Sequence, residues 1–160
     1  MLKNLQVLHN AGLAHRDLKP ANIVIGLGKE RNKLYLIDFG LTKKLTRKRD
    51  PAAFMQGKVT GTALYSSINA HIGCGEARKA DDIESLLYLL VFFYRGTLPW
   101  RSQKEDEKKN YLRMLRIKQN IRTADLFQGF PDQYMVVHEY IRTLPDPDDV
   151  DYSFIEQQLR

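Results

Sequence analysis

The sequence contains a single cysteine, Cys74, among its 160 residues. One cysteine cannot form an intramolecular disulfide framework, and it excludes a zinc site built from cysteines alone. No apolar run approaches the roughly 18 residues that a membrane-spanning helix needs. The first residues lead into an amphipathic pattern, not into the charged and then apolar segments of a secretory signal. These absences predict a soluble chain that works in a reducing compartment, the cytoplasm or the nucleus.

Neither sign of charge is scarce, because 25 Lys and Arg residues stand against 19 Asp and Glu, which gives a net charge of +6. The composition, 43% hydrophobic and 28% charged, is typical of a globular chain and argues against disorder. The length suffices for one domain or for part of a larger one. The densest basic run, residues 43–49, has no interleaved aromatic side chain. We therefore favour a solvated loop there over a patch for acidic or phosphorylated peptides or for nucleic acid.

Periodic apolar residues predict helices in five segments, which are residues 1–11, 81–94, 104–118, 134–144 and 154–160. The second segment gives the strongest signal, with Asp82 as a candidate N-terminal cap and Gly96 just beyond its end. Its side chains are apolar nearly all round, which predicts a helix buried in the middle of the fold.

Two short runs of β-branched and apolar residues, 23–25 and 34–37, predict the strands of a small hairpin. Gly26 and Gly28 lie between them but lack the third glycine of a G-x-G-x-x-G pattern, so we interpret this connection as a turn. Residues 40–67 are rich in basic residues, glycine and threonine, show no period and predict a long loop. The sequence thus predicts a mainly α-helical body with one small hairpin.

Three oxygen-bearing side chains, Asp17, Asn22 and Asp38, surround this hairpin. Asn22 comes just before the first strand and Asp38 just after the second, and a hairpin brings these two ends together. Mg²⁺ is commonly bound by one or two carboxylates together with substrate phosphates. Lys19, two residues beyond Asp17, adds a positive charge suited to a transferring phosphoryl group.

The same residues belong to two longer patterns, His-Arg-Asp-Leu-Lys-x-x-Asn at 15–22 and Asp-Phe-Gly at 38–40. The 15 residues between the two patterns hold both predicted strands. Either fragment alone occurs by chance in many proteins. The two together, at this spacing, are far more specific, and they resemble the catalytic and metal-binding loops of protein kinases.

More narrowly, the chain resembles the casein kinase I family. Protein kinases usually close the activation segment with Ala-Pro-Glu, whereas this chain has Ser67-Ile68-Asn69, a replacement typical of casein kinase I. Further likeness extends over essentially the whole chain, at residues 37–44, 61–73, 78–86, 96–100 and 151–153.

The resemblance implies a mainly α fold with a small β-hairpin, namely the large C-terminal lobe of a kinase without the β-rich N-terminal lobe. Residues 1–160 would then form a partial protein kinase domain. Its parts would be the catalytic loop 15–22, the metal-binding loop 38–40, the activation segment 40–69 and the central helix 81–94.

Carried over residue by residue, the resemblance implies a serine/threonine kinase that transfers the γ-phosphate of ATP to hydroxyl groups of protein substrates. Asp17 would accept the proton of the substrate hydroxyl, and Lys19 would neutralise the γ-phosphate. Asn22 and Asp38 would bind Mg²⁺ and, through it, ATP. Thr62 resembles the threonine that contacts the catalytic aspartate and lysine in serine/threonine kinases.

Other positions take supporting roles or depart from the family. Asp82 resembles the carboxylate that anchors the backbone of the catalytic loop. The family has Gly-Thr-Ala-Arg-Tyr where this chain has Leu64 in place of the arginine, which predicts a weaker preference for phosphorylated, primed substrates. We interpret His9, His71 and His138, which have no matching partners in the sequence, as packing or surface residues.

No segment matches the Gly-rich loop, the third-strand lysine or the helix glutamate of a kinase, and 14 residues precede His15. Because phosphoryl transfer depends mainly on positioning and charge stabilisation, we expect these 160 residues alone to be inactive or nearly so. Three hypotheses remain: a casein kinase I-like enzyme, a non-catalytic kinase-derived binding module, and a nucleic-acid-binding protein. We favour the first, with protein substrates, including acidic or phosphorylated ones, as partners. We expect no membrane partner, and nucleic acid is the partner that we favour least.

Overall fold

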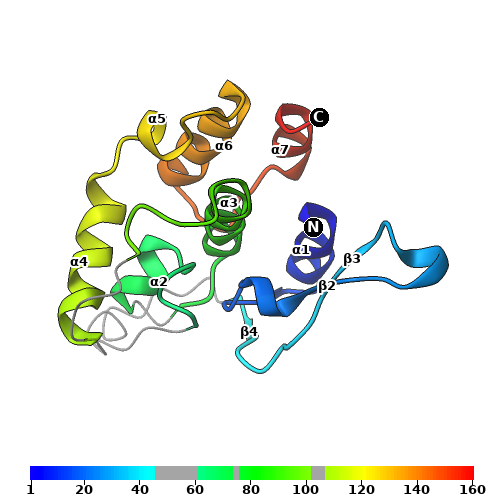
Figure 1. The fold of residues 1–160 in the computed structure, drawn as a ribbon. Coiled ribbons are helices and arrows are strands. Elements are labelled where there is room, and N and C mark those ends of the chain that lie inside the picture. The colour runs from blue at the N-terminus through cyan, green and yellow to red at the C-terminus, as the bar shows by residue number, and fades with distance from the viewer. Residues whose placement is uncertain (46–60, 74–75, 102–106) are drawn as a thin grey trace.

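The computed structural model describes residues 1–45, 61–73, 76–101 and 107–160 (Figure 1). The helices are α1 (Leu2–Asn10), α2 (Ile68–Ile72), α3 (Lys79–Arg95), α4 (Glu107–Asn120), α5 (Thr123–Leu126), α6 (Asp132–Thr143) and α7 (Tyr152–Gln158). The strands are β1 (Leu13–Ala14), β2 (Ile23–Ile25), β3 (Leu34–Leu36) and β4 (Lys43–Lys44), and short 3₁₀ turns cover Pro20–Asn22 and Gly28–Glu30. The expected mainly helical fold with a small hairpin is confirmed.

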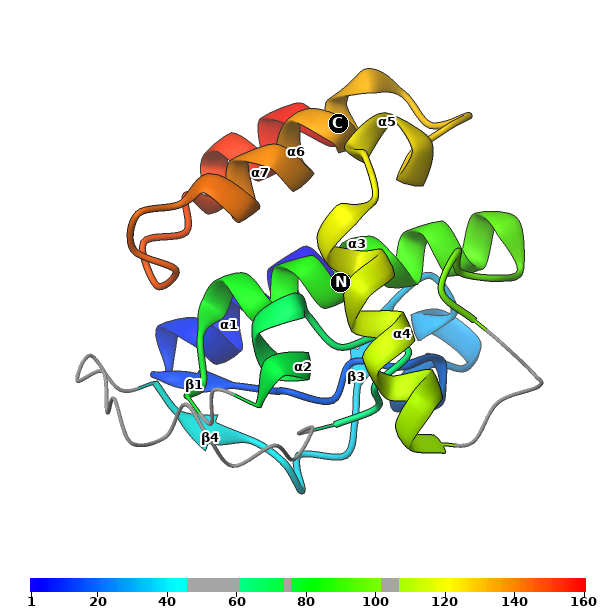
Figure 2. The same cartoon turned by 90° about the vertical axis from the view of Figure 1, so that its left-hand side faces the viewer.

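Helix α3 is the axis of the molecule. Helices α1, α2 and α6 pack against it, and Figure 2 shows α6 and α7 stacked on one side of it. Every residue from Ala80 to Leu89 is buried, which confirms the burial predicted for this helix, whereas Phe93 and Tyr94 at its end are exposed. Although α3 is apolar, no helix among the described residues has both the length and the hydropathy of a membrane span.

The core around α3 draws side chains from elements far apart in the sequence. Fully or almost fully buried contributors outside α3 are Leu5, Leu18, Leu98, Trp100, Leu126, Phe127, Val137 and Ile155. The Trp100 ring packs edge-on against the ring of Tyr88 on α3, with 4.7 Å between the ring centroids. Burying one such large apolar side chain contributes about 2–3 kcal/mol, so this core is the main source of stability.

The predicted hairpin is confirmed, since β2 and β3 pair antiparallel with Ile23 opposite Leu36. A second strand pair was not expected: β1 and β4 pair antiparallel, with Leu13 opposite Lys44. The prediction of an unbroken loop over residues 40–67 is therefore wrong at its beginning. Two-residue strands are too short to show the alternation by which a strand is recognised in a sequence.

Helix α2 was also not expected, and it follows directly on the predicted loop. The side chain of Ser67 caps it by accepting a hydrogen bond from the Ala70 backbone N–H at 2.9 Å, and Gly73 ends it in the left-handed conformation. Residues 46–60 lie outside the described residues. Most of the basic run 43–49 is thus not covered by the structure.

The N-terminus of α3 differs from the expectation. The helix begins at Lys79, so Asp82 lies inside the first turn and is not the cap. Asp148, in the loop between α6 and α7, instead accepts a hydrogen bond from the Lys79 backbone N–H at 3.0 Å. Asp82 is buried and bonds to the catalytic loop, which is why it cannot serve the end of its own helix.

The core predicts a sharp contrast between two leucines on helices. Leu89 on α3 is 0% exposed, whereas Leu112 on α4 is 56% exposed. We expect Leu89→Ala to lower the free energy of unfolding by about 3 kcal/mol, because it leaves a cavity in the core. The matched Leu112→Ala variant should change it by no more than about 0.5 kcal/mol. Urea unfolding followed by circular dichroism measures both values, and equal losses would contradict the packing described above.

Candidate active site

The hairpin positions the two predicted loops. Residues 15–22 connect β1 to β2, and residues 38–40 follow β3. The backbone N–H of Ile37 donates to the carbonyl oxygen of Asn22 at 2.9 Å, which extends the pairing one residue beyond the strands. Asp38 therefore comes directly after the residue paired with Asn22. The structure thus places both residues at one end of the hairpin, and their role as ligands stays a prediction.

The carboxylate of Asp17 is the most heavily bonded group of the site. The Lys19 ammonium donates to its Oδ2 at 2.6 Å. Thr62 donates twice to its Oδ1, from the backbone N–H at 2.9 Å and from the hydroxyl at 2.8 Å. Burial alone would raise the pKa of Asp17, but the bonds from Lys19 and Thr62 outweigh it and hold that pKa below its usual value. Asp17 is therefore an ionised acceptor at neutral pH.

Asn22 and Asp38 complete the polar end of the hairpin. Asn22 is buried, and its Nδ2 donates to the carbonyl oxygen of Asp17 at 2.8 Å and to the Asp17 carboxylate at 3.3 Å. Asp38 is exposed, and its Oδ1 accepts the Gly40 backbone N–H at 3.2 Å. The pKa of Lys19 is raised mainly by its bond to Asp17, with a smaller contribution from the charge of Asp38. The three predicted polar residues and Lys19 thus form one cluster.

The donor set of this cluster fits Mg²⁺. The Nδ2 of Asn22 donates to Asp17, so the amide oxygen Oδ1 is the atom of this side chain that could bind a cation. Amide and carboxylate oxygens are the donors that this hard cation prefers. Among the described residues, no group of three His, Cys, Asp or Glu side chains could hold a metal by itself. A magnesium ion here would therefore depend on Asn22, on Asp38 and on oxygens supplied by a substrate.

His15 ties the two loops together. Its Nε2 lies 3.2 Å from the carbonyl oxygen of Ile37, which can only accept, so Nε2 carries the proton. Its Nδ1 then accepts the backbone N–H of Asp17 at 3.3 Å. Its ring packs edge-on against Phe39, with 5.4 Å between centroids. One buried imidazole thus fixes the position of the catalytic loop relative to the segment that carries Asp38.

Asp82 anchors the backbone of the catalytic loop, as expected from the sequence. Its Oδ2 accepts the His15 N–H at 2.7 Å, and its Oδ1 accepts the Arg16 N–H at 2.9 Å. Arg16 has a φ of +72°, a conformation that a residue with a side chain rarely adopts. Such a backbone persists only where its surroundings hold it in place, and Asp82 provides two of the bonds that do so.

Of the two alternatives given for His9, His71 and His138, packing is confirmed and a surface position is wrong. His9 is buried, its Nε2 donates to Asp82 Oδ2 at 2.8 Å, and its Nδ1 is hydrogen-bonded to the hydroxyl of Tyr152 on α7. His71 and His138 are also buried and bonded, so none of the three is a surface residue without partners. These partners are invisible in the sequence, since His9 and Tyr152 are 143 positions apart.

Gly61 is a site residue that the sequence analysis missed. It has a φ of +82°, and a Cβ at this position would collide with the carbonyl oxygen of Arg16 and lie 3.2 Å from the Asp17 carboxylate. Only glycine lets the chain pass this close to the catalytic loop. Its position immediately before Thr62 is the signal that could have identified it.

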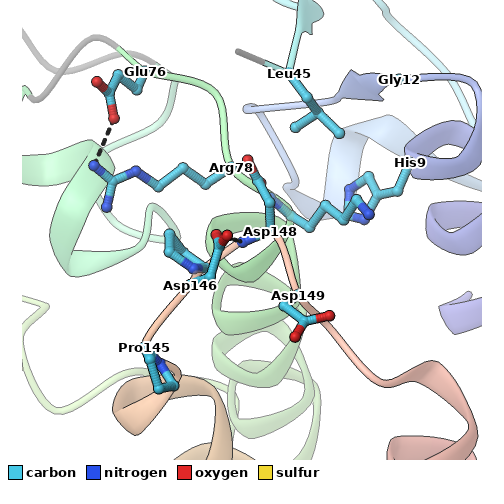
Figure 3. A pocket seen from close by; sticks show the side chains of 11 residues that line it. His9, Gly12, Leu45, Glu76, Arg78, Pro145, Asp146, Asp148 and Asp149 are labelled. Carbon is cyan, nitrogen blue, oxygen red and sulfur yellow. Dashed lines mark hydrogen bonds and ion pairs between the residues drawn. The ribbon is translucent and has the colours of Figure 1, made fainter. Parts of the chain in front are cut away.

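A large cavity among the described residues lies away from this cluster. It has a volume of about 950 Å³ and is lined by His9, by Glu76 and Arg78, and by residues 145–149 (Figure 3). Two of its charged side chains, Arg78 and Glu76, form an ion pair of 2.7 Å. Asp17 and Asn22 do not line this cavity.

The anchoring role of Asp82 can be tested by Asp82→Asn. Asparagine has one side-chain oxygen in place of two, and its amide N–H would face backbone donors. We expect a loss of about 3 kcal/mol or more in the free energy of unfolding, measured by urea denaturation, and faster amide exchange at His15 and Arg16. Asp132→Asn, at an exposed position of α6, is the control. Similar losses in the two variants would show that Asp82 is not an anchor.

The hydroxyl of Thr62 can be removed with little change of shape by Thr62→Val. The pKa of Asp17 should rise, because one of the bonds that lower it is lost. A carboxyl whose folded pKa is depressed stabilises the fold above its unfolded pKa of about 3.9 and loses that contribution as pH falls through the folded pKa. In the variant this contribution should therefore be smaller, and its loss should be complete at a higher pH. A ¹³C NMR titration of the Asp17 carboxyl checks this, Thr62→Ser should restore the original value, and an unchanged pKa in the valine variant would contradict the prediction.

A comparison with protein-family models gives an independent result. The model of the protein kinase domain matches residues 1–148, which is 148 of the 160 residues of the chain. The match spans the catalytic loop, the hairpin, the segment that follows it and the central helix. The chain belongs to the protein kinase family.

Proposed function

We propose that the chain is the large lobe of a casein kinase I-like serine/threonine protein kinase. One observation supports the proposal most strongly: Lys19 donates a hydrogen bond to one oxygen of the Asp17 carboxylate, and the Thr62 hydroxyl donates to the other. A protein kinase uses ATP and Mg²⁺ and acts on protein substrates. Under this proposal residues 1–160 are a partial kinase domain that works in the cytoplasm or the nucleus.

The geometry supports a simple division of labour. The ionised carboxylate of Asp17 accepts the proton of a serine or threonine hydroxyl while that oxygen bonds to the γ-phosphorus and the bond to the ADP oxygen breaks. Lys19, which already contacts Asp17, neutralises charge on the transferring phosphoryl group. Mg²⁺, when bound, would offset the charge of the phosphate oxygens, and Asn22 and Asp38 are the residues that would hold it. Thr62 keeps the carboxylate aimed at the acceptor.

The narrower assignment to casein kinase I rests on the segment Ser67-Ile68-Asn69. Ser67 Oγ donates to Asp81 Oδ1 at 2.7 Å, and Asn69 Nδ2 donates to Asp81 Oδ2 at 3.1 Å. Burial raises the pKa of Asp81 to about 7, against the opposing effect of these two bonds. The two polar residues of this signature therefore share one physical task, which is to fasten the end of the activation segment to α3.

Leu64 bears on the choice of substrate. Its side chain packs against the hydrophobic core, and its carbonyl oxygen accepts the indole N–H of Trp100 at 2.8 Å. An arginine at this position would instead offer a charge to a phosphate group on the substrate. We therefore propose that acceptor sites without a priming phosphate are used at least as well as primed ones.

A non-catalytic binding module is the second candidate, and one observation favours it. Large apolar side chains are exposed on α1, on the hairpin and around it, among them Val7, Ile25, Leu27 and Phe39. A cavity of about 630 Å³ between α1 and β3 opens beside them. Exposed apolar patches of this kind mark places where another protein surface packs. A module of this type would bind its partner in the absence of ATP.

Titration with Mg·ATP, followed by NMR, separates the two candidates. The kinase proposal predicts shifts at the amides of Asn22 and Asp38. Asp38→Asn should weaken the magnesium-dependent binding roughly tenfold or more, because a charged oxygen ligand is lost. The backbone should not change, since asparagine tolerates the φ of +63° at this position.

Two controls make the titration decisive. Asp132→Asn, on α6, should bind Mg·ATP like the original chain. Asp17→Asn should bind Mg·ATP too. The original 160-residue chain is expected to transfer labelled γ-phosphate to a serine peptide at or near the background rate. Any transfer above background should disappear in Asp17→Asn. Binding that ignores Asp38, or transfer that persists without Asp17, would contradict the kinase proposal and favour the binding module.

A further inference from the structure

Lys118 is a buried lysine that the proposed chemistry does not use. It lies near the end of α4 and is 0% exposed, among the largest side chains of the described residues to be fully enclosed. Burying an ammonium group is costly unless its hydrogen bonds are replaced. An apolar side chain of similar length would fill the same space without that cost. A buried cation here therefore indicates a specific task.

The ammonium of Lys118 meets three close acceptors, and the hydroxyl oxygen of Ser66 lies farther away, at 3.5 Å. It donates to the carbonyl oxygens of Ala63 at 2.7 Å and Ser66 at 2.6 Å, and it lies 3.3 Å from Nδ1 of His71. The Nε2 of His71 carries that ring's proton, because its partner at 3.0 Å is the carbonyl oxygen of Tyr111. Nδ1 is therefore free to accept from Lys118. Three close acceptors suit the ammonium form, which has three protons to donate, better than the neutral amine, which has two.

The surroundings of Lys118 act on its charge in both directions, because two aromatic rings and Glu84 favour the ammonium form whereas burial disfavours it. Its Nζ lies 5.3 Å from the centroid of the Trp100 ring and 5.5 Å from that of Tyr88, within the range of cation–π attraction. Burial lowers the pKa of Lys118 to about 7, while the charge of Glu84 opposes this shift. Burial and the charge of Lys118 lower the pKa of His71 to about 4, so the imidazole is the neutral acceptor that Lys118 requires.

The two carbonyl groups that Lys118 holds belong to the segment that carries Thr62. Between them, Trp100 holds the carbonyl oxygen of Leu64. The carbonyl oxygen of Thr62 in turn accepts the backbone N–H groups of Tyr65 at 3.0 Å and Ser66 at 3.1 Å. Donors from α4 and from the Trp100 turn thus fix one side of this segment. From the same segment Thr62 donates to Asp17.

We infer that Lys118 is a positioning residue that holds residues 62–66 in place, so that Thr62 stays bonded to Asp17. The inference rests on the proposed function as a serine/threonine kinase, because Thr62 and Asp17 have their meaning there. Lys118 touches neither Asp17 nor the place of a substrate hydroxyl. It acts through the backbone of the substrate-facing segment.

The test replaces Lys118 by methionine, which has a similar length and no donor, and compares Gln119→Met, an exposed neighbour on α4. Amide exchange by NMR should accelerate about tenfold or more at Thr62, Tyr65 and Ser66 relative to amides of α3, as expected when a charge-assisted hydrogen bond is lost. The Thr62 amide proton should also move upfield as its bond to the Asp17 carboxylate weakens. Gln119→Met should show neither change.

Two results would overturn the inference. Unchanged exchange and an unchanged Thr62 shift in Lys118→Met would show that the segment keeps its place without the ammonium. Equal acceleration at the three amides and throughout α3 would show that Lys118 serves only overall stability. If Lys118→Met does not fold, Lys118→Gln, which keeps two donors, is judged by the same comparison. Where both fold, the glutamine variant should recover part of the Thr62 shift. None of these readouts needs ATP or turnover, so a failure of the kinase proposal is seen separately.

Discussion

Two neighbouring carboxylates in the first turn of α3, Asp81 and Asp82, hold two polar segments of the chain in place by hydrogen bonds. Asp82 accepts the backbone N–H groups of His15 and Arg16, and Asp81 accepts hydrogen bonds from the side chains of Ser67 and Asn69. Consecutive residues of a helix point about 100° apart, so one turn of one helix serves both segments. The positions of the loop 15–22 and of residues 67–69 relative to each other are therefore set by a single rigid element. The hydrophobic burial of α3 is what holds that element still.

The parts that could be predicted depend on local spacing. The distance in sequence between Asn22 and Asp38 accommodates a hairpin, and antiparallel pairing then brings their ends together whatever surrounds them. The apolar run of α3 likewise predicts that the helix is buried, because few polar residues interrupt it. The role of Asp82 could be expected only through the family resemblance, and reasoning from helix ends alone assigned it to a cap, since an acidic residue near the start of a helix is usually one.

The parts that could not be predicted depend on pairs of residues far apart in the sequence. His9 and Tyr152 are hydrogen-bonded where α1 packs against α7, and the sequence of neither segment predicts this contact. Lys118 sits in a highly charged helix, where a lysine is normally solvated, and only the fold reveals that its side is covered. Strand pairs of two residues, such as Leu13 with Lys44, are below the length at which periodicity has meaning.

The neighbouring positions of α1 and α7 have a consequence for the order of the chain. Lys3 and Glu156, near opposite ends of the sequence, are joined by an ion pair of 3.6 Å, and Figure 1 shows the two termini on the same side. A short linker could therefore join them, and new ends could be opened at an exposed turn such as the one between β2 and β3. Such a circularly permuted chain would keep every contact described above, because the fold depends on which segments meet and not on where the chain starts.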